Sequence, residues 1–482
     1  MPSLSPGTPP WVERHYSSLA LATLTFAAFN LTFRLSQEMV QVWDESLYAT
    51  SALEMLRNGH WAITTFQGEP DYYNSKPPLN VWLIALSFKA FGASIGTLRV
   101  PSALTAWLTV LVVQVWSRRH LGAGVALLAT LVLGTTYGFL YTHSGRTANA
   151  DAPLTLVLTL TFIAAWAAQR RPWHGAWLGL LTAAAFMLKG PGALALVAPF
   201  LVADAVEGLR RGQDRRTWAR SRLSGMVLGA IPAGAWAHAR WQYDQWRFFE
   251  RMVEYDALAR VGSAIEGHTE SPFYYLDMLQ RRQYEWLVVG VVAALLAPTA
   301  LRRARHWLAE PPARSLVPAW LVASVVLPTL AATKLAWYLN PFYPLLAMAV
   351  AGATWHAWTT VAAERRRTLA GAFACLVAVA VVAGEAKLGW QSYRRLDLRR
   401  SAQGLLVEHA DRLQGHRVFA VHCPYPEAFL AGTAGATCVP ANVETFLRDG
   451  GSGDVWLGGR EEHIPALTRL GSNRRASLHQ KP

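Results

Sequence analysis

Long apolar stretches separated by short polar ones repeat along most of the chain. Stretches of this kind occupy residues 19–33, 125–140, 154–168, 225–239 and 288–300. A helix that crosses a bilayer needs about 20 mostly apolar residues, with about 17 as the lower limit. Several stretches are close to that limit, and they recur too often to be the cores of soluble domains. The pattern therefore predicts an all-α polytopic membrane protein.

Arginine clusters between the apolar stretches predict which loops are cytoplasmic. The clusters lie at residues 118–120, 170–171, 210–222, 302–305 and 365–367. With the N-terminus inside, about eleven crossings keep every cluster inside. These crossings lie near residues 17–35, 100–117, 122–141, 149–168, 174–188, 191–206, 222–240, 284–301, 315–332, 337–358 and 368–390. Residues 79–91 are too few for a full span, so we interpret them as a half-helix or interfacial segment. If they cross, one other boundary moves; the estimate is about eleven crossings, with about 13 possible.

The composition agrees with a membrane protein. Of 482 residues, 52% are hydrophobic and only 16% are charged, against about 25% charged in soluble proteins. The net charge of +14 comes from short clusters and not from a basic face with interleaved aromatic residues, so we expect no nucleic-acid partner. The apolar segment near the N-terminus has no small-residue cleavage site and is too long for a signal peptide, so we expect it to be retained.

The composition changes after about residue 390. Strand-like residues 418–421 and 454–457, separated by Gly, Pro and Asn, predict a small soluble α/β domain over residues 391–482, after a membrane domain of residues 1–390. Two of the three cysteines, Cys423 and Cys438, lie in this tail, which suits an oxidising compartment. Whether they pair is left open. Arginines at the start of the tail favour the cytoplasm, whereas helix parity favours the outside, which is our expectation.

Unusual polar residues lie in the loops opposite the arginine clusters, chiefly near residues 36–78 and 241–282. Asp44 precedes a short amphipathic stretch that stops near Gly59. One interpretation makes Asp44 a helix N-cap and Glu45 a partner of the helix dipole. The other makes one of these carboxylates a general base that faces a polar pocket at the membrane surface.

Two further motifs allow both a structural and a functional interpretation. Lys76, before two prolines, can be a snorkelling loop anchor. Lys334 and Tyr338 lie at a helix break forced by Pro341 and Pro344, and a broken helix at membrane depth usually lines a cavity.

Taken in order, the motifs resemble a known family. WDESLYA, EPDYYNSKPPLNVW, GRTANADAPLTL, FMLKGPGAL and TKLAWYLNPFYP follow one another within about residues 15–350. They are similar to the integral-membrane family 39 glycosyltransferases of the C-type fold, and more closely to bacterial lipid A aminoarabinose transferases and protein-mannosyltransferase-like enzymes. The resemblance implies an inverting glycosyltransferase in the cell inner membrane. It would move a sugar from a polyprenyl-phosphate donor to an envelope acceptor (lipid A, a glycan, a lipid or a protein) on the outer side.

The resemblance also implies catalytic residues. Asp44, in the acidic pair with Glu45, would activate or position the acceptor nucleophile, and Asp151 would be the second external acidic residue. These residue types suit the reaction, since an acceptor hydroxyl or phosphate needs a carboxylate to take or orient its proton. Attack from the face opposite the leaving phosphate inverts the anomeric carbon in one step.

On the donor side, the resemblance implies phosphate-binding residues. Lys76 would contact the lipid phosphate, with Arg260 and His268 in the long external loop and Lys334 and Tyr338 in the later Lys-x-x-x-Tyr segment. A phosphate leaving group departs as a stabilised anion, so it needs cations where negative charge develops.

One position departs from the family pattern. Aminoarabinose transferases typically carry Glu before Lys-Pro-Pro, where this chain has Ser75. That Glu can join a histidine in holding a metal near the phosphate. We therefore assign no cofactor; a divalent metal is the candidate that Ser75 makes doubtful, and the same change weakens the assignment to aminoarabinose.

Two other functions compete with a transferase. A transporter or flippase of lipid-linked sugars would also carry intramembrane charges, but inverted repeats would favour it and none is visible. A polysaccharide ligase would have a long external loop with Arg and His but no acidic pair after the first helix. The Asp-Glu pair and the Lys-Pro-Pro motif favour the transferase.

Overall fold

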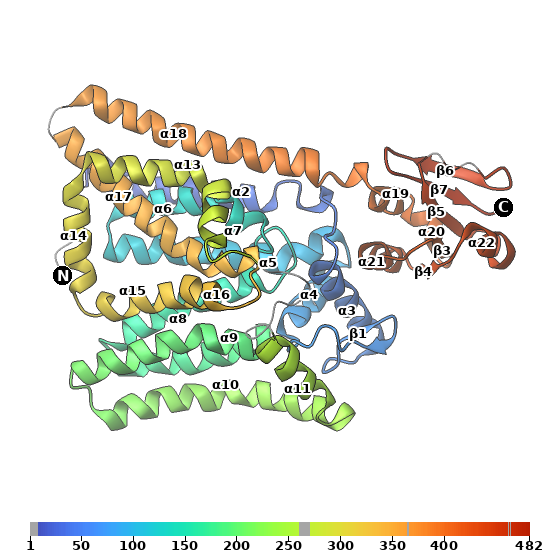
Figure 1. The fold of residues 1–482 in the computed structure, drawn as a ribbon, viewed down its shortest axis with the longest axis horizontal. Coiled ribbons are helices and arrows are strands. Elements are labelled where there is room, and N and C mark those ends of the chain that lie inside the picture. The colour runs from blue at the N-terminus through green and yellow to red at the C-terminus, as the bar shows by residue number, and fades with distance from the viewer. Residues whose placement is uncertain (1–7, 260–269, 364–365, 461, 463) are drawn as a thin grey trace.

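The computed structural model describes residues 8–259, 270–363, 366–460, 462 and 464–482. Long helices run side by side along the long axis of the molecule, and a small domain with a sheet lies at one end (Figure 1). The helices up to the tail are α1 (Pro10–Arg14), α2 (Tyr16–Thr32), α3 (Asp44–Asn58), α4 (Leu79–Phe91), α5 (Ile95–His120), α6 (Ala123–Thr135), α7 (Tyr137–Tyr141), α8 (Asp151–Ala168), α9 (Ala176–Arg210), α10 (Arg215–Asp244), α11 (Arg247–Arg251), α13 (Tyr274–Leu296), α14 (Pro298–Ala309), α15 (Ala313–Leu321), α16 (Leu327–Leu330), α17 (Tyr343–Ala363) and α18 (Arg367–Trp390).

Six segments within the described ranges are long and apolar enough to cross a membrane, or seven if the bent pair α13–α14 is one span. They are Tyr16–Gln37, Ile95–His120, Asp151–Ala168, Pro172–Arg210, Ala313–Leu330 and Arg367–Arg395. This number is below the expected eleven because α6 is short and because α10 and α17 are not among these segments. In addition, two predicted crossings, residues 174–188 and 191–206, are merged in α9.

The helix α9 reverses direction at its centre. Lys189 and Gly190 have non-helical backbone angles, and the φ of Gly190 is +62°. Arg222 of α10 contacts both ends of α9: its side chain lies against Gly175, just before the first half, and pairs with Asp204 in the second half at 2.8 Å. The two halves are therefore antiparallel, and Lys189 is at the turn between them.

The arginine clusters and the predicted polar loops lie at opposite ends of the bundle. Arg118, at the end of α5, pairs with Glu13 of the N-terminal helix α1. In Figure 1 the N-terminal end, α14 and the turn between α9 and α10 lie at the left, which we call the arginine end. The helices α3 and α4 and the small domain lie at the right. This arrangement agrees with the alternation of loops expected from the sequence. As expected, residues 79–91 form one short helix, α4.

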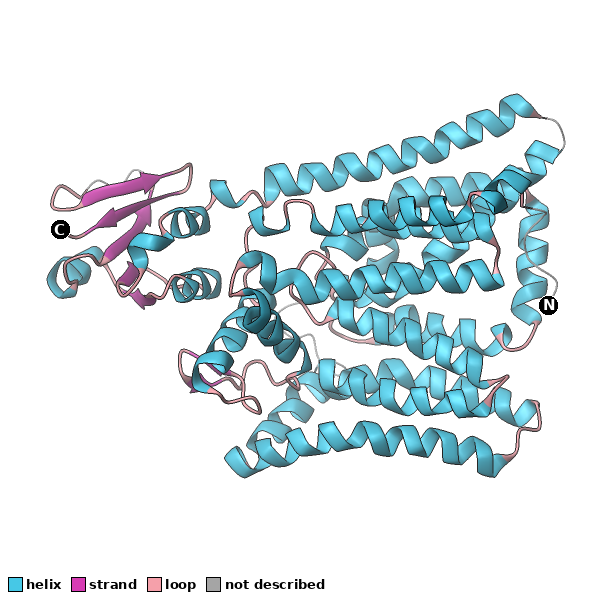
Figure 2. Cartoon of the chain, turned by 180° about the vertical axis from the view of Figure 1, so that it is seen from behind, coloured by secondary structure: helices cyan, strands magenta, loops and turns pink. Residues whose placement is uncertain are grey.

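The tail forms a small α/β domain. Its helices are α19 (Ala402–Glu408), α20 (Ala410–Leu413), α21 (Tyr425–Thr433) and α22 (Val443–Asp449), and its strands are β3 (Arg417–Ala420), β4 (Thr437–Pro440), β5 (Val455–Gly459), β6 (Thr468–Ser472) and β7 (Ala476–Gln480). The strand order is β4-β3-β5-β7-β6, with β3 parallel to β4 and β5 and the remaining pairs antiparallel. Figure 2 shows this sheet in magenta, apart from the helical bundle. A short hairpin, β1 (Thr65–Phe66) and β2 (Glu69–Pro70), follows α3.

The tail packs directly on the first polar loop. Arg57 of α3 donates to the carbonyl of Gly432 in α21 at 2.5 Å. The Gln403 side chain accepts from the backbone N–H of Val40 and donates to its carbonyl, at 2.8 and 2.9 Å. Apolar residues of α3, α4, α5 and the tail share one core. The tail is therefore on the same side of the bundle as residues 36–78, which agrees with helix parity.

The tail also contains a disulfide. Cys423 and Cys438 are bonded, with their Cα atoms 5.9 Å apart. The pairing that the sequence left open is thus present in the structure, and it joins the segment before α21 to β4.

Candidate active site

Asp44 is the first residue of α3, and the N-cap is Trp43. The interpretation of Asp44 as the N-cap was therefore wrong. Trp43 has a φ of +74°, a conformation that is strained for a bulky residue and costs about 1–3 kcal/mol. Its ring lies 6.1 Å from Tyr73 and 5.9 Å from Tyr425 of the tail. The Trp43 ring therefore packs against both tyrosines, and the unusual backbone conformation of Trp43 comes directly before Asp44.

Glu45 has a different environment from Asp44 although it is the next residue. Its side chain is 0% exposed and bonds Arg99 at 2.7 and 3.1 Å. The carboxylate also accepts from the backbone N–H groups of Gln41 and Ala148. Both oxygens are thus occupied by donors from three separate segments. This geometry suits a residue that positions the loops around Asp44, rather than the general base that the sequence also allowed.

A second buried ion pair supports the same loops. Arg146 lies 2.6 Å from the carboxylate of Glu38, which also accepts from the Tyr141 hydroxyl at 2.8 Å. Arg146 donates in addition to the carbonyl of Phe33. The loop before α8 is therefore joined to the segment between α2 and α3.

Asp44 points toward basic side chains from two other segments. Its side chain is 29% exposed; one oxygen is 4.0 Å from the Nζ of Lys76 and the other is 3.9 Å from the Nδ1 of His143. The His143 ring stacks on Trp337 with centroids 3.7 Å apart. Burial lowers the pKa of His143, and the nearby negative charge of Asp44 opposes this shift. A carboxylate, an ammonium group and an imidazole therefore meet at the start of α3.

Asp151 forms a neighbouring group with the reversal in α9. Its carboxylate is 2.6 Å from the Nζ of Lys189, and both side chains are largely buried. The Lys189 ammonium also lies over the Tyr338 ring at 5.9 Å. The charges of Asp44 and Asp151 both act on His143, so the two groups adjoin one another.

The Lys-Pro-Pro motif packs against the same reversal. A Cβ added to Gly190 would be 3.4 Å from Pro77 and from the Met252 side chain. Lys76 lies over the Tyr48 ring at 5.8 Å. Contact between Pro77 and Gly190 thus places Lys76 and Lys189 at one site although they are far apart in the chain.

The remaining predicted residues are placed as follows. Lys334 donates to the carbonyl of Ala331 in its own segment at 2.9 Å. Arg260 and His268 lie outside the described residues. Ser75 is fully buried, and within the described ranges no three His, Cys, Asp or Glu side chains are grouped so as to hold a metal ion. The expectation that Ser75 argues against a divalent metal stays a prediction.

Sequence reasoning did not identify the role of three residues. His143 lies beside Asp44, Lys189 pairs with Asp151, and Arg99 pairs with Glu45. A lysine within the apolar FMLKGPG stretch and a histidine just before the GRTANAD motif were the available signals. An arginine at the start of a long apolar helix, as Arg99 is in α5, was a third.

Comparisons of the sequence found one matching family and several similar proteins. The family described as dolichyl-phosphate-mannose-protein mannosyltransferase matches residues 75–236. The undecaprenyl phosphate-alpha-4-amino-4-deoxy-L-arabinose arabinosyl transferase of Pseudomonas paraeruginosa is 29% identical over 329 residues, which are 67% of this chain and 57% of that protein. The chain thus spans little more than half the length of this relative.

Solved structures decide the fold. The crystal structure of ArnT from Cupriavidus metallidurans in the apo state superposes with a TM-score of 0.67 at 17% identity, covering 96% of this chain and 98% of that chain. The same protein bound to undecaprenyl phosphate gives a TM-score of 0.62 at 17% identity over 98% of both chains. The chain has the ArnT fold. The predicted polytopic C-type fold and the resemblance to this glycosyltransferase family are confirmed.

The ArnT fold extends well beyond the family match. Residues 75–236 include Lys76, Asp151 and Lys189, whereas Asp44 and Tyr338 lie outside this range. Coverage of 96% of the chain also includes most of the tail. The two groups around Asp44 and Asp151 are therefore assembled by the complete fold.

Proposed function

We propose that this chain is an inverting glycosyltransferase that takes a sugar from a polyprenyl-phosphate donor. The observation that carries the proposal is the position of Asp44, whose partly exposed carboxylate lies 4.0 Å from Lys76 and 3.9 Å from His143. The reaction needs a base for the acceptor and a cation for the leaving phosphate. Both are present at one place, at the end of the bundle where the tail packs.

In the proposed step, the acceptor oxygen bonds to the anomeric carbon as the bond from that carbon to the phosphate oxygen breaks. The electron pair leaves with the polyprenyl phosphate, and Lys76 stabilises its charge. The acceptor proton moves to Asp44. Because bond formation and bond breaking occur on opposite faces, the configuration inverts.

Asp151 and Lys189 have a supporting place in this proposal. Their 2.6 Å pair is buried beside His143, so it holds the reversal of α9 against the start of α8. Tyr338, beside Lys189, and Lys334 extend the polar surface on this side. Arg260 and His268 are proposed as additional phosphate-side residues from the external loop.

The relatives suggest the substrates. The names of the Pseudomonas protein and of the ligand-bound ArnT structure contain undecaprenyl phosphate, and the former contains 4-amino-4-deoxy-L-arabinose. We accordingly propose an undecaprenyl-phosphate-linked sugar as the donor, with aminoarabinose as the first sugar to test and lipid A as the first acceptor. The proposed location is the cell inner membrane, with the site facing outward, because the arginine clusters lie at the opposite end.

Donor binding tests the proposal directly. Lys76→Ala in the purified full chain should weaken the affinity for an undecaprenyl-phosphate sugar about 10- to 100-fold, because hydrogen bonds to charged groups contribute about 1.5–3 kcal/mol. Lys89→Ala removes an exposed lysine at the end of α4 and should leave affinity unchanged. Equal affinities for Lys76→Ala and the wild type would reject the donor role.

The reaction itself is distinguished from transport by its product. A transferase releases one undecaprenyl phosphate for each sugar moved, whereas a transporter moves the intact lipid-linked sugar. Mass spectrometry of envelope lipids and glycans from cells with and without the chain identifies the acceptor. Movement of sugar without release of undecaprenyl phosphate would contradict the proposed function.

A further inference from the structure

The helix α14 lies across the arginine end of the bundle. It is bent by 97° from α13, and Figure 1 shows it nearly at right angles to the long helices. Arg302, Arg303 and Arg305 on this helix are exposed, as are Leu301 and Leu308. A helix with both basic and apolar exposed residues, oriented across the spanning helices, is typical of a segment that lies in the membrane interface.

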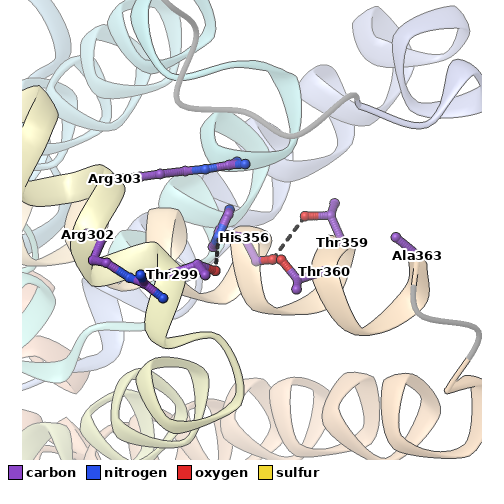
Figure 3. Close-up of a pocket in the computed structure, with 7 residues that line it drawn as sticks. All are labelled: Thr299, Arg302, Arg303, His356, Thr359, Thr360 and Ala363. Carbon is purple, nitrogen blue, oxygen red and sulfur yellow. Dashed lines mark hydrogen bonds between the residues drawn. The ribbon is translucent and has the colours of Figure 1, made fainter.

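A cavity of about 670 Å³, lined mainly by polar and basic residues, lies between α14 and α17. Thr299, Arg302, Arg303, His356, Thr359, Thr360 and Ala363 line it (Figure 3). His356 is only 6% exposed; its Nε2 is 3.2 Å from the Thr299 hydroxyl, and its Nδ1 has no hydrogen-bond partner in the described part of the chain. Buried polar atoms are normally paired, so this nitrogen is available to a polar group that enters the cavity.

An apolar cavity of about 420 Å³ continues from the polar one, because Arg303 and His356 line both. Its walls come from α5, α6, α8, α13, α14, α15, α17 and the segment before α17, and include Trp116, Phe162 and Gly352. Unhydrated cavities of this kind are apolar and take up apolar ligands. Next to a bilayer, the most abundant apolar ligand is a lipid acyl chain.

We infer that an anionic glycerophospholipid of the adjoining leaflet binds here, with its phosphate at Arg302 and Arg303 and one acyl chain in the apolar cavity. Guanidinium groups bind phosphate in a bidentate manner. Neither arginine has a carboxylate partner among the described residues, and basic pockets between helices on the cytoplasmic side bind anionic head groups. The buried His356 supplies a further polar contact beside the head group. This site is at the opposite end of the bundle from Asp44 and does not depend on the proposed transfer reaction.

Binding of phosphatidylglycerol to the delipidated full chain, measured by native mass spectrometry in detergent, tests the inference. The double variant Arg302→Gln/Arg303→Gln should bind about 30-fold more weakly, which corresponds to about 1 kcal/mol for each arginine. Arg215→Gln/Arg216→Gln removes two exposed arginines at the same end of the bundle and should bind as the wild type does. Phosphatidylcholine should bind less tightly than phosphatidylglycerol.

A second variant tests the acyl-chain cavity without changing charge. A Cβ added to Gly352 meets no atom within 4 Å, so Gly352→Leu should fill the cavity while the helix folds normally. We expect it to reduce binding of phosphatidylglycerol at least about tenfold with an unchanged unfolding temperature. Equal binding by the arginine double variant and the wild type would overturn the inference. Binding of inorganic phosphate as tight as that of the lipid, or a Gly352→Leu protein that folds and binds normally, would overturn it as well.

Discussion

At the scale of single residues, two adjacent carboxylates have different environments, because one is buried and the other is partly exposed. Glu45 is enclosed by Arg99 and two backbone N–H groups. Asp44 is partly exposed and has His143 and Lys76 at 3.9 and 4.0 Å. A reacting group needs access to the substrate, and a positioning group needs fixed partners. We therefore propose Asp44 as the reacting group and Glu45 as the positioning group.

Glu45→Gln should therefore destabilise the fold. It leaves the buried guanidinium of Arg99 without a counter-charge, and breaking a buried pair on one side costs about 3–5 kcal/mol. The free energy of unfolding, measured by denaturant titration in detergent, checks this. If the single variant is as stable as the wild type, the positioning role is wrong.

His143 should make stability fall in acid. Burial lowers its pKa in the folded protein, so the neutral ring is favoured there. The resulting stability is present above the unfolded pKa of about 6.5 and is lost as the pH falls through the lower folded value. Each unit of pKa lowering corresponds to about 1.4 kcal/mol.

Thermal unfolding between about pH 7.5 and 5 measures this effect. The wild type should lose stability toward pH 5, and His143→Gln should show a flatter dependence. His60→Gln, which removes an exposed histidine after α3, is the control and should keep the wild-type dependence. Parallel profiles for His143→Gln and the wild type would exclude the imidazole as the cause.

At the scale of elements, the reversal in α9 brings together motifs that are distant in the sequence. Gly190 has a φ of +62° and packs within contact distance of Pro77. Its ψ is −148°, and this combination of angles is open essentially only to glycine and costs a residue with a Cβ about 1–3 kcal/mol. The reversal therefore requires glycine at this position, directly after the lysine that pairs with Asp151.

Gly190→Ala should lower stability by about 1–3 kcal/mol and impair donor binding through a displaced Lys76 loop. Gly371→Ala in α18 is a matched control, because a Cβ there meets no atom within 4 Å and alanine favours a helix by up to about 1 kcal/mol. Unfolding and donor affinity of both variants check this. If Gly190→Ala matches Gly371→Ala in both measurements, the reversal does not depend on the glycine.

Helices and breaks could be predicted from the sequence, but their contacts could not. Apolar length and Lys-Gly-Pro punctuation indicated two helices within residues 174–206, and short length marked residues 79–91. The assignment of Asp44 as the N-cap of α3 was wrong because Trp43 takes this position. The ring of Trp43 packs against Tyr73 and Tyr425, and Tyr425 is in a different domain. Capping preferences read from neighbouring residues cannot predict contacts between residues that are far apart in the sequence.

At the scale of the whole molecule, the tail closes over the end that carries the candidate site. Its α21 bonds to α3 through Arg57, and Tyr425 contacts Trp43. The sequence predicted the small α/β domain and its side from helix parity. It could not predict the docking, which depends on apolar residues shared by α3, α4, α5 and the tail.

The tail should accordingly lie outside the cytoplasm. Reporter fusions after residue 400 should be active only with an extracytoplasmic reporter, while fusions within the turn between α9 and α10 should show the opposite result. Reduction of the Cys423–Cys438 bond should lower stability by about 3 kcal/mol, as expected for a loop of about 15 residues. Fusions after residue 400 that work only with a cytoplasmic reporter would contradict this orientation.

The most direct test of the transfer mechanism is the single-turnover rate of purified Asp44→Asn with an undecaprenyl-phosphate sugar and its acceptor. Asn keeps the size of the side chain but removes its charge and its basicity, and a general base contributes about 10²–10⁴-fold in rate. We predict a loss of at least about 100-fold with donor affinity retained. Asp277→Asn, at an exposed acidic residue of α13, should transfer at the normal rate. Transfer by Asp44→Asn at close to the wild-type rate would show that Asp44 only begins a helix.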